Sequence, residues 1–280
     1  MTSTVSKMPG ALRPAMERLE ASIRAHGPMA VACSGGVDSG LLAVVAHRVL
    51  GGRMLCVLGV SPSLARDEEA RAVAFFEAHA LPFVRIHTRE MDVAGYRANG
   101  PDRCFFCKHE LFERMEAAPE ARAFPVLAYG ANADDRFDHR PGARAADAHR
   151  VCAPLAECGF TKQMVRDAAR ALGLEVWDKP ASPCLASRIP YASEVTEAKL
   201  RQIDAAESVL RSHGFDVCRV RHHGELARIE VPAADIARLE ARELWPVVCD
   251  ALRAAGFVRV EVDPRGFKSG RMNEAIAPPS

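Results

Sequence analysis

A glycine-rich hexapeptide, Ser34-Gly35-Gly36-Val37-Asp38-Ser39, constrains this chain more than any other feature. The apolar run before it, residues 28–33, predicts a short buried strand, and the apolar run after it, residues 40–47, predicts a helix. Adjacent glycines let successive backbone N–H groups turn toward one point, and the start of a helix adds positive potential there. The hexapeptide therefore predicts an anion site, in which its two serines donate hydroxyl hydrogen bonds and Asp38 holds a magnesium ion.

The same hexapeptide is not a Walker A loop, because no Gly-Lys-Ser/Thr follows it. It resembles the pyrophosphate loop of the ATP pyrophosphatases, the superfamily of amidotransferases, NAD synthetases and tRNA-thiolating enzymes. These enzymes cleave ATP between its α and β phosphates and adenylate an acceptor. The resemblance implies that residues 34–39 bind ATP, while an ordinary Gly-Ser turn is the structural alternative.

Composition narrows the class of protein. The 280 residues are 49% hydrophobic, and 37 Lys and Arg against 36 Asp and Glu give a formal net charge of +1. This balance disfavours nucleic-acid binding through bulk charge. The N-terminus has no continuous apolar segment typical of a secretory signal, and no apolar run reaches membrane-spanning length. We therefore expect a soluble cytoplasmic protein with no membrane partner.

Apolar runs that read as strands alternate with amphipathic stretches in the first part of the chain. This alternation predicts an α/β fold with a parallel doubly wound sheet, whose ligands bind at the carboxyl ends of the strands. The pattern changes near residue 180, where a Pro-, Ser- and Ala-rich loop leads into a compact α+β module. We expect an ATP pyrophosphatase domain over residues 1–180, and the cysteine loop with a small α+β domain for substrate binding or oligomerisation over residues 181–280. Strands are expected at residues 28–33, 53–60, 83–87, 125–130, 217–221, 226–231 and 258–262, and helices at 12–26, 40–47, 64–79, 196–213, 233–241 and 244–255.

Three of the nine cysteines stand in patterns that indicate chemistry. Cys104 and Cys107 form a C-x-x-C, which is half of a zinc or iron–sulfur site, or a redox pair, or two cysteines packed at a helix start. Cys184 lies in a loop with prolines on both sides and with Lys179 and Arg188 as flanking cations. Cations near a thiol favour the nucleophilic thiolate, so Cys184 is a better reactive candidate than cysteines in buried strands.

Two further groups of charged residues are candidates for binding. Asn132, Asp134 and Asp135 follow the fourth expected strand, where a nucleotide or its metal would lie, although each also suits a solvated turn. Arg219 and Arg221 alternate on an expected strand, so their guanidinium groups share one face and suit capture of a phosphate or carboxylate. The basic, glycine-rich segment 264–271 either closes over an anion or is a solvated tail, and Arg140 continues the loop that follows Asp135.

Taken together, these segments resemble the LarE family, the ATP-dependent sulfur transferases that mature the nickel-pincer nucleotide cofactor of lactate racemase. The resemblance covers almost the whole chain and is carried by the hexapeptide, the segment 132–142, the Cys184-Leu185-Ala186-Ser187-Arg188 loop and Arg219-Val220-Arg221-His222-His223-Gly224. It implies an adenine nucleotide alpha hydrolase-like fold, ATP and Mg²⁺ as cofactors, and a homo-oligomer, a hexamer in that family.

The family adenylates a carboxylate of pyridinium-3,5-biscarboxylate mononucleotide, and a cysteine then supplies sulfur and AMP leaves. In one branch that cysteine is sacrificed, and in another three cysteines bind a [4Fe-4S] cluster that carries the sulfide. Cys104, Cys107 and Cys184 match the three-cysteine pattern, which implies a cluster here. Arg219 and Arg221 would then anchor the phosphate of this small-molecule nucleotide. The rival hypotheses are a tRNA-thiolating enzyme of the same superfamily and a non-catalytic nucleotide-binding protein.

Overall fold

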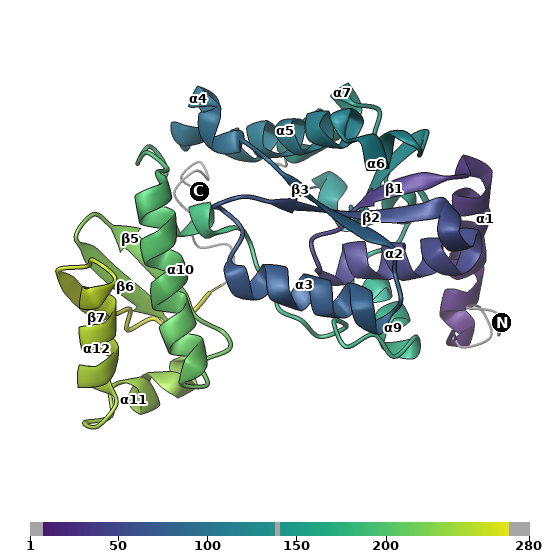
Figure 1. Cartoon of the computed structure of the whole chain (residues 1–280). Coiled ribbons are helices and arrows are strands. Elements are labelled where there is room, and N and C mark those ends of the chain that lie inside the picture. The colour runs from purple at the N-terminus through teal and green to yellow at the C-terminus, as the bar shows by residue number, and fades with distance from the viewer. Residues whose placement is uncertain (1–7, 138–140, 269–280) are drawn as a thin grey trace. The chain divides into compact units, whose positions relative to one another are not determined.

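The structure is a computed structural model, and it describes residues 8–137 and 141–268. The contacts divide the chain into two compact units (Figure 1). The first unit contains the described residues up to Ser61 together with Glu68–Glu90 and Cys104–Pro180. The second contains Pro62–Asp67, Met91–Arg103 and the described residues from Ala181 onward. The main boundary thus follows Pro180, and two short earlier segments also belong to the second unit.

A four-stranded parallel sheet forms the centre of the first unit, in the order β3-β2-β1-β4. Met29 of the central strand lies opposite Met54 on one side and Val126 on the other. The strands are rich in Val, Leu and Ala because helices cover both faces of the sheet, as is usual for parallel sheets. The predicted α/β fold is confirmed. The strands are β1 (Met29–Ala32), β2 (Met54–Val60), β3 (Phe83–His87) and β4 (Val126–Tyr129).

Helices α2, α3 and α9 lie on one face of this sheet, and α5 and α7 lie on the other (Figure 1). Helix α2 is apolar on nearly all sides because it packs against the sheet, α1 and α9. The helices belonging wholly or mostly to this unit are α1 (Arg13–His26), α2 (Val37–Leu50), α3 (Arg66–Ala78), α5 (Arg103–Ala117), α6 (Pro119–Arg122), α7 (Pro141–Ala148), α8 (Pro154–Glu157) and α9 (Lys162–Ala171).

The second unit is a small α+β module, as predicted. Strands β5 (Arg219–His223) and β6 (Leu226–Glu230) are antiparallel, and β7 (Arg259–Val262) pairs parallel to β6. One face of this sheet carries Val220, Ala227 and Ile229, which pack into a core with the long helix α10 and with α12. The remaining elements include α4 (Ala94–Arg97), η6 (Leu185–Arg188), α10 (Glu197–Ser212), α11 (Ile236–Leu239) and α12 (Trp245–Ala254).

The structure adds helices that were not expected from the sequence. Helices α5, α7 and α9 all fall between residues 100 and 175, where only one strand was expected. The predicted Pro-rich loop is largely irregular, with a single 3₁₀ turn, η6, directly after Cys184. Arg140 and the end of the basic segment, from residue 269, lie outside the described residues. Within the described ranges, no helix is both long and apolar enough to cross a bilayer.

Candidate functional site

The glycine-rich loop joins β1 to α2, at the carboxyl end of a central strand. Gly35 has φ of +70°, and a Cβ there would stand 2.7 Å from the Cβ of Ala72, so only glycine fits. Ser39 is buried, donates its hydroxyl to the Gly36 carbonyl at 3.3 Å and accepts the Ser34 N–H at 3.2 Å. Ser39 therefore holds the loop in shape, whereas Ser34 is exposed.

Helix α2 begins at Val37, three residues earlier than expected, so Asp38 lies in its first turn. The end of β4 comes very close to this turn, because a Cβ on Gly130 would lie 2.5 Å from the backbone nitrogen of Ser39. Such a contact is closer than a side chain tolerates, so glycine lets β4 deliver the following loop to the start of α2. The predicted Asn132–Asp135 segment is thereby brought to the glycine-rich loop.

Asp38 is the centre of a polar cluster in the first unit. Its Oδ1 accepts a hydrogen bond from the Asn132 amide at 3.0 Å, and its Oδ2 pairs with Nζ of Lys162. Asp134 accepts the backbone N–H of Lys162 at 2.8 Å, and Asp135 accepts that of Asn132 at 3.1 Å. The two aspartates thus hold the residues that contact Asp38 by accepting their backbone N–H groups.

Lys179 lies on the other side of the glycine-rich loop. Its Nζ donates to the Gly35 carbonyl at 3.0 Å and pairs with Glu68 at 2.8 Å. From the sequence this lysine was expected to flank the Cys184 thiol, and that stays a prediction. Two lysines therefore stand within the loop's own unit, which suits a ligand with several phosphate charges.

Cys184 lies in the second unit, immediately before η6, and is half-buried. Arg188 is buried and donates to the Pro183 carbonyl at 2.5 Å and to the Cys184 carbonyl at 3.1 Å. The same guanidinium forms a two-pronged ion pair with the buried Glu207 at 2.8 and 2.9 Å. Although burial raises it, the Arg188 charge and hydrogen bond hold the pKa of Glu207 below its ordinary value. This pair anchors the cysteine loop to α10.

Arg219 and Arg221 lie on one face of β5, as their alternation predicted. Arg219 donates to the carbonyls of Cys218 and Ala181 at 2.7 and 2.8 Å, and it is 8% exposed. Arg221 donates to the Ser187 carbonyl at 2.9 Å and pairs with Glu230 at 2.9 Å. Burial, and then the charge of Arg188, lower the pKa of Arg219 to about 10. Their role as a phosphate anchor stays a prediction.

The C-x-x-C cysteines lie in the first turn of α5. Cys104 is exposed and Cys107 half-buried, and their spacing of three puts both on one side of the helix. Among the described residues, no three His, Cys, Asp or Glu side chains are grouped closely enough to hold a metal ion. The three-cysteine cluster therefore stays a prediction.

The cysteine directly after β1 and the cysteine in β2 were expected to be less reactive than Cys184, because they lie in or beside buried strands. Cys33 and Cys56 are buried, and their mutual hydrogen bond lowers the pKa of Cys33 and, together with burial, raises the pKa of Cys56. Burial also raises the pKa of Cys152 and Cys218 to about 12 in each case. Raised values keep thiols protonated and unreactive at neutral pH.

Comparison with known proteins decides the family. No family model matches the chain. It is 39% identical over 246 residues to an uncharacterized protein of Synechocystis sp., covering 88% of this chain and 92% of that protein. It is 32% identical over 259 residues to the pyridinium-3,5-bisthiocarboxylic acid mononucleotide synthase of Lactiplantibacillus plantarum, covering 92% of this chain and 93% of that protein.

The chain belongs to the LarE family. It is also 28% identical over 214 residues to a protein of Thermoplasma volcanium that forms part of a glutamine-hydrolyzing GMP synthase, covering 70% of this chain and 67% of that protein. The parallel sheet and the GMP synthase relatives fit the adenine nucleotide alpha hydrolase-like fold. As a LarE-family member with pyrophosphate-loop relatives, the protein is an ATP-using enzyme.

Lys162 is the site residue of this LarE-family chain that was not expected from the sequence. It begins α9, whose helix N-cap is Thr161, with the Met164 N–H donating to the threonine hydroxyl at 3.3 Å. A threonine followed by apolar residues at helical spacing, Val165 and Ala168, is a helix-start signal that could have located this element. Nothing in the sequence pairs Lys162 with Asp38, because that contact spans 124 residues.

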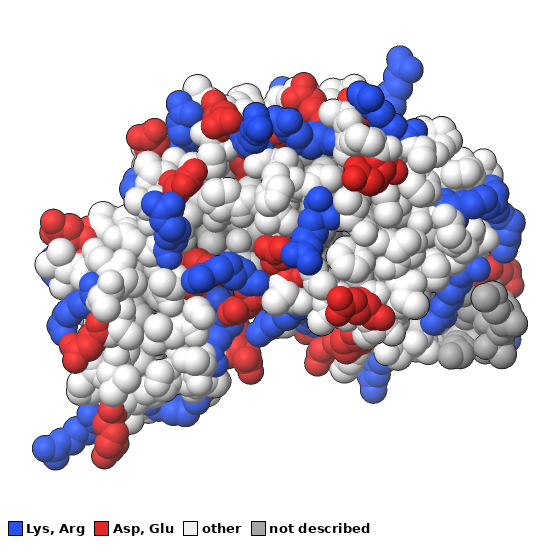
Figure 2. Space-filling model, viewed as in Figure 1, with Lys and Arg blue, Asp and Glu red and all other residues white. Residues whose placement is uncertain are grey.

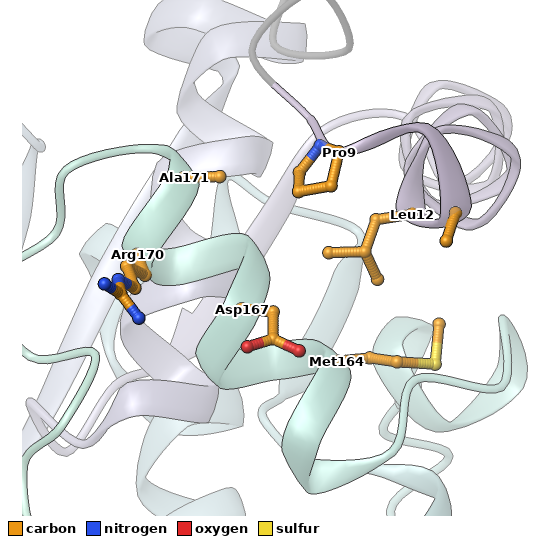
Figure 3. A pocket seen from close by; sticks show the side chains of 7 residues that line it. Pro9, Leu12, Met164, Asp167, Arg170 and Ala171 are labelled. Atoms are coloured by element: carbon orange, nitrogen blue, oxygen red, sulfur yellow. The ribbon is translucent and has the colours of Figure 1, made fainter.

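A pocket of about 790 Å³ in the same unit is lined by residues of the N-terminal segment and α9 (Figure 3). Pro9 and Leu12 face Met164 and Asp167 of α9 across it. Its lining includes none of the residues singled out in the sequence.

Proposed function

We propose that this LarE-family protein is an ATP-dependent sulfurtransferase. Its substrate is pyridinium-3,5-biscarboxylate mononucleotide, one carboxylate of which is adenylated and then converted to a thiocarboxylate. The observation that carries the proposal is the 32% identity along 92% of the chain to a synthase named for the bisthiocarboxylic product. The loop geometry around Asp38 supports the ATP-dependent half of the reaction.

The first step is an attack on ATP. A carboxylate oxygen of the substrate bonds to the α-phosphorus, the bond from that phosphorus to the bridging oxygen breaks, and pyrophosphate leaves with the electron pair. Backbone N–H groups of the glycine-rich loop and the first turn of α2 stabilise the departing charge, because they are fixed before the reaction begins. Lys162 and Lys179 add positive charge in the same unit.

The carboxylates at this loop suit a magnesium ion. Asp38 and Asp134 supply oxygen donors of the kind that Mg²⁺ prefers, while Asn132 donates its amide N–H to Asp38. Asp38 now pairs with Lys162, so ion binding requires the ammonium to move. An incoming triphosphate offers Lys162 a more highly charged partner, and its transfer to a phosphate oxygen frees Asp38. When bound, the ion shields the charge of the leaving pyrophosphate.

The second step is sulfur transfer to the acyl adenylate. A sulfur nucleophile bonds to the acyl carbon, and AMP leaves with its oxygen. Cys184 acts here, either as the donor itself or as one ligand of a [4Fe-4S] cluster with Cys104 and Cys107. As the donor, its thiolate forms a thioester with the acyl carbon. Loss of the Cα proton then breaks the Cβ–Sγ bond, which leaves the sulfur on the product and dehydroalanine in the chain. The accessible thiol pair on α5 fits cluster ligation, which uses thiolates. Such a cluster, when bound, would present a sulfide that can be replenished.

The deciding experiment measures three products with purified protein, ATP and the biscarboxylate nucleotide. Substrate-dependent release of both pyrophosphate and AMP, with a thiocarboxylate seen by mass spectrometry, is the expected result. Release of pyrophosphate only with transfer RNA would instead indicate the tRNA-thiolating rival. Figure 2 favours the small substrate, because Lys and Arg are interleaved with Asp and Glu over the face in view.

A second assay addresses the sulfur source. Anaerobic reconstitution should give about four irons per chain for a [4Fe-4S] cluster, and Ser substitution at Cys104, Cys107 or Cys184 should each reduce the count. Protein that binds no iron and loses the Cys184 sulfur once per turnover would indicate the sacrificial route. We also propose that the chain forms a homo-oligomer, a hexamer as in the family, which light scattering measures.

A further inference from the structure

The loop that carries Cys184 has an unusual hydrogen-bonding pattern in the second unit. Outside the 3₁₀ turn η6 it lacks regular structure, so its backbone carbonyls need partners from elsewhere. Five of the seven carbonyls from Ala181 to Ser187 accept a hydrogen bond from an arginine. The bonds run from Arg219 to Ala181 (2.8 Å), from Arg188 to Pro183 (2.5 Å) and Cys184 (3.1 Å), from Arg103 to Ala186 (3.0 Å) and from Arg221 to Ser187 (2.9 Å).

These arginines come from separate elements. Arg103 begins α5, Arg188 ends η6, and Arg219 and Arg221 lie on β5. Arg103, Arg188 and Arg219 are 8% exposed or less. Burying a guanidinium costs free energy unless its N–H donors are satisfied. Apolar residues at these buried positions would avoid that cost, so we look for a role of the arginines in fixing the loop.

Two carboxylates fix the orientation of two of these arginines, Arg188 and Arg221. Glu207 receives both prongs of Arg188, and Glu230 receives one terminal nitrogen of Arg221 while the other reaches Ser187. Arg219 likewise uses one terminal nitrogen for Cys218 and the other for Ala181. A guanidinium fixed at two points holds a carbonyl in a defined place, as a flexible lysine does not.

We propose that Arg103, Arg188, Arg219 and Arg221 form a guanidinium cradle that positions Cys184 for sulfur transfer by holding the carbonyls of its loop. Arg219 and Arg221 are then positioning residues, and they act on the loop and not on the phosphate of the substrate. This assignment rests on the proposed function, in which Cys184 takes part in sulfur transfer.

The cradle explains how an irregular loop can place one sulfur reproducibly. Ordering each loop residue costs conformational entropy, and charged hydrogen bonds offset this cost better than neutral ones. A small misplacement of a reacting atom slows a reaction strongly. Adenylation takes place without Cys184, so the cradle should affect the second step of the reaction and spare the first.

The test compares Arg221→Met, Arg221→Lys and the matched control Arg228→Met. Arg228 lies opposite Arg221 in the β5–β6 register, on the same sheet face, and pairs with Glu261. Three quantities are measured in each variant: hydrogen exchange of peptides covering residues 181–193, single-turnover pyrophosphate release, and the kcat and KM of thiocarboxylate formation.

We expect Arg221→Met to accelerate exchange in this loop and to lower kcat for thiocarboxylate by about tenfold or more. Pyrophosphate release and the KM for the nucleotide substrate should stay near wild type. Arg221→Lys keeps the positive charge but places its N–H donors on a single nitrogen, so it should recover part of the loss in kcat. Arg228→Met should match wild type. If Arg221→Met does not fold, Arg219→Lys and the double variant Arg221→Met/Glu230→Gln carry the same comparison.

An increased KM with unchanged loop exchange would overturn the cradle and restore Arg221 as a phosphate anchor. Unchanged exchange and unchanged kinetics would also overturn it. Failure of the proposed function is a different result, because wild type would then form no thiocarboxylate, and normal product from Cys184→Ser would remove Cys184 alone from the reaction. The exchange measurement would still report whether the arginines hold the loop.

Discussion

The two chemically important loops of this protein are built on opposite principles. The glycine-rich loop after β1, for which we propose ATP binding, is shaped by glycines and a buried serine. The Cys184 loop turns carbonyls toward arginines and is shaped by fixed positive charge. In the proposed function, N–H groups of the first loop bind phosphate, while the carbonyls of the second accept hydrogen bonds from within the protein. A substrate can therefore rearrange the first site, as at the Lys162–Asp38 pair, whereas the second is set before any substrate arrives.

The largest effect expected from this difference is at Asp38. Asp38→Ala should abolish pyrophosphate release, because it removes the carboxylate that we assign to magnesium. Circular dichroism should stay that of a folded protein, since Asp38 is partly exposed. Asp167→Ala, which removes an α9 carboxylate bonded to Gln163, is the matched control. Near-normal pyrophosphate release from folded Asp38→Ala would remove Asp38 from the mechanism.

Removing the carboxylate that pairs with Arg188 in the second loop should instead lower the free energy of unfolding. Glu207→Leu leaves the buried Arg188 without its carboxylate, and removal of one partner from a buried pair costs about 3–5 kcal/mol. Denaturant unfolding measures this loss. Glu197→Ala, on the same helix but in an exposed pair with Arg201, should cost about 0.5 kcal/mol or less. Equal effects of the two changes would show that the buried pair does not hold the loop.

The same pair predicts a pH dependence. The pKa of Glu207 is lower in the folded protein than its ordinary value of 4.5, so its ionised form stabilises the fold. This contribution is fully present above pH 4.5 and is lost as the pH falls below that value through the folded pKa. The stability difference between wild type and Glu207→Leu should therefore shrink as the solution is acidified from about pH 6. A difference that stays constant down to about pH 3 would contradict this.

A smaller effect is expected where β4 meets the glycine-rich loop. Gly130→Ala puts a methyl group 2.5 Å from the Ser39 nitrogen, so the start of α2 must shift. Overpacking of this kind costs about 1–3 kcal/mol, and the displaced N–H groups should weaken ATP binding as well. Calorimetry measures both quantities. Gly52→Ala, where a Cβ meets nothing within 4 Å, should leave ATP binding unchanged.

The smallest effect compares two identical helix caps. Thr161 caps α9 and Thr196 caps α10, each accepting a backbone N–H at 3.3 Å. Alanine at either position should cost about 1 kcal/mol of stability. Only Thr161→Ala should also raise the KM for ATP, because α9 begins at Lys162. If Thr196→Ala changes the KM equally, the effect belongs to stability and not to the position of Lys162.

Much of this architecture was predictable because local patterns determine it. The strand before Ser34 and the strand carrying Arg219 and Arg221 were both found from apolar or alternating runs. Helix α2 was expected to begin later because Val37–Ser39 were interpreted as part of the turn, but Gly36 is the residue that ends the extended backbone. Periodicity is a local property, and these elements obey it.

The interactions that define the two sites were less predictable. Lys162 contacts Asp38 although 124 residues separate them in the sequence. Glu207 forms its two-pronged pair with Arg188 because the fold buries these two side chains together. Lys179 stands five residues before Cys184 in the sequence, yet its contacts are with Gly35 and Glu68. The distant partners of a long side chain do not follow from its sequence neighbours, because they depend on how the chain folds.

Contacts with the early segment 91–103 determine when the Cys184 loop can become ordered during synthesis of the chain. Asn99 donates to the carbonyls of Ile189, Pro190 and Ser193, and Arg103 donates to Ala186, which follows it by 83 residues. During synthesis these two residues leave the ribosome long before their partners exist, so the loop closes late and at a large loop-closure cost. A fragment starting at residue 181 would lack both residues. The Cys184 loop thus becomes ordered only after Arg219 and Arg221 have been synthesised, when the whole first unit already exists.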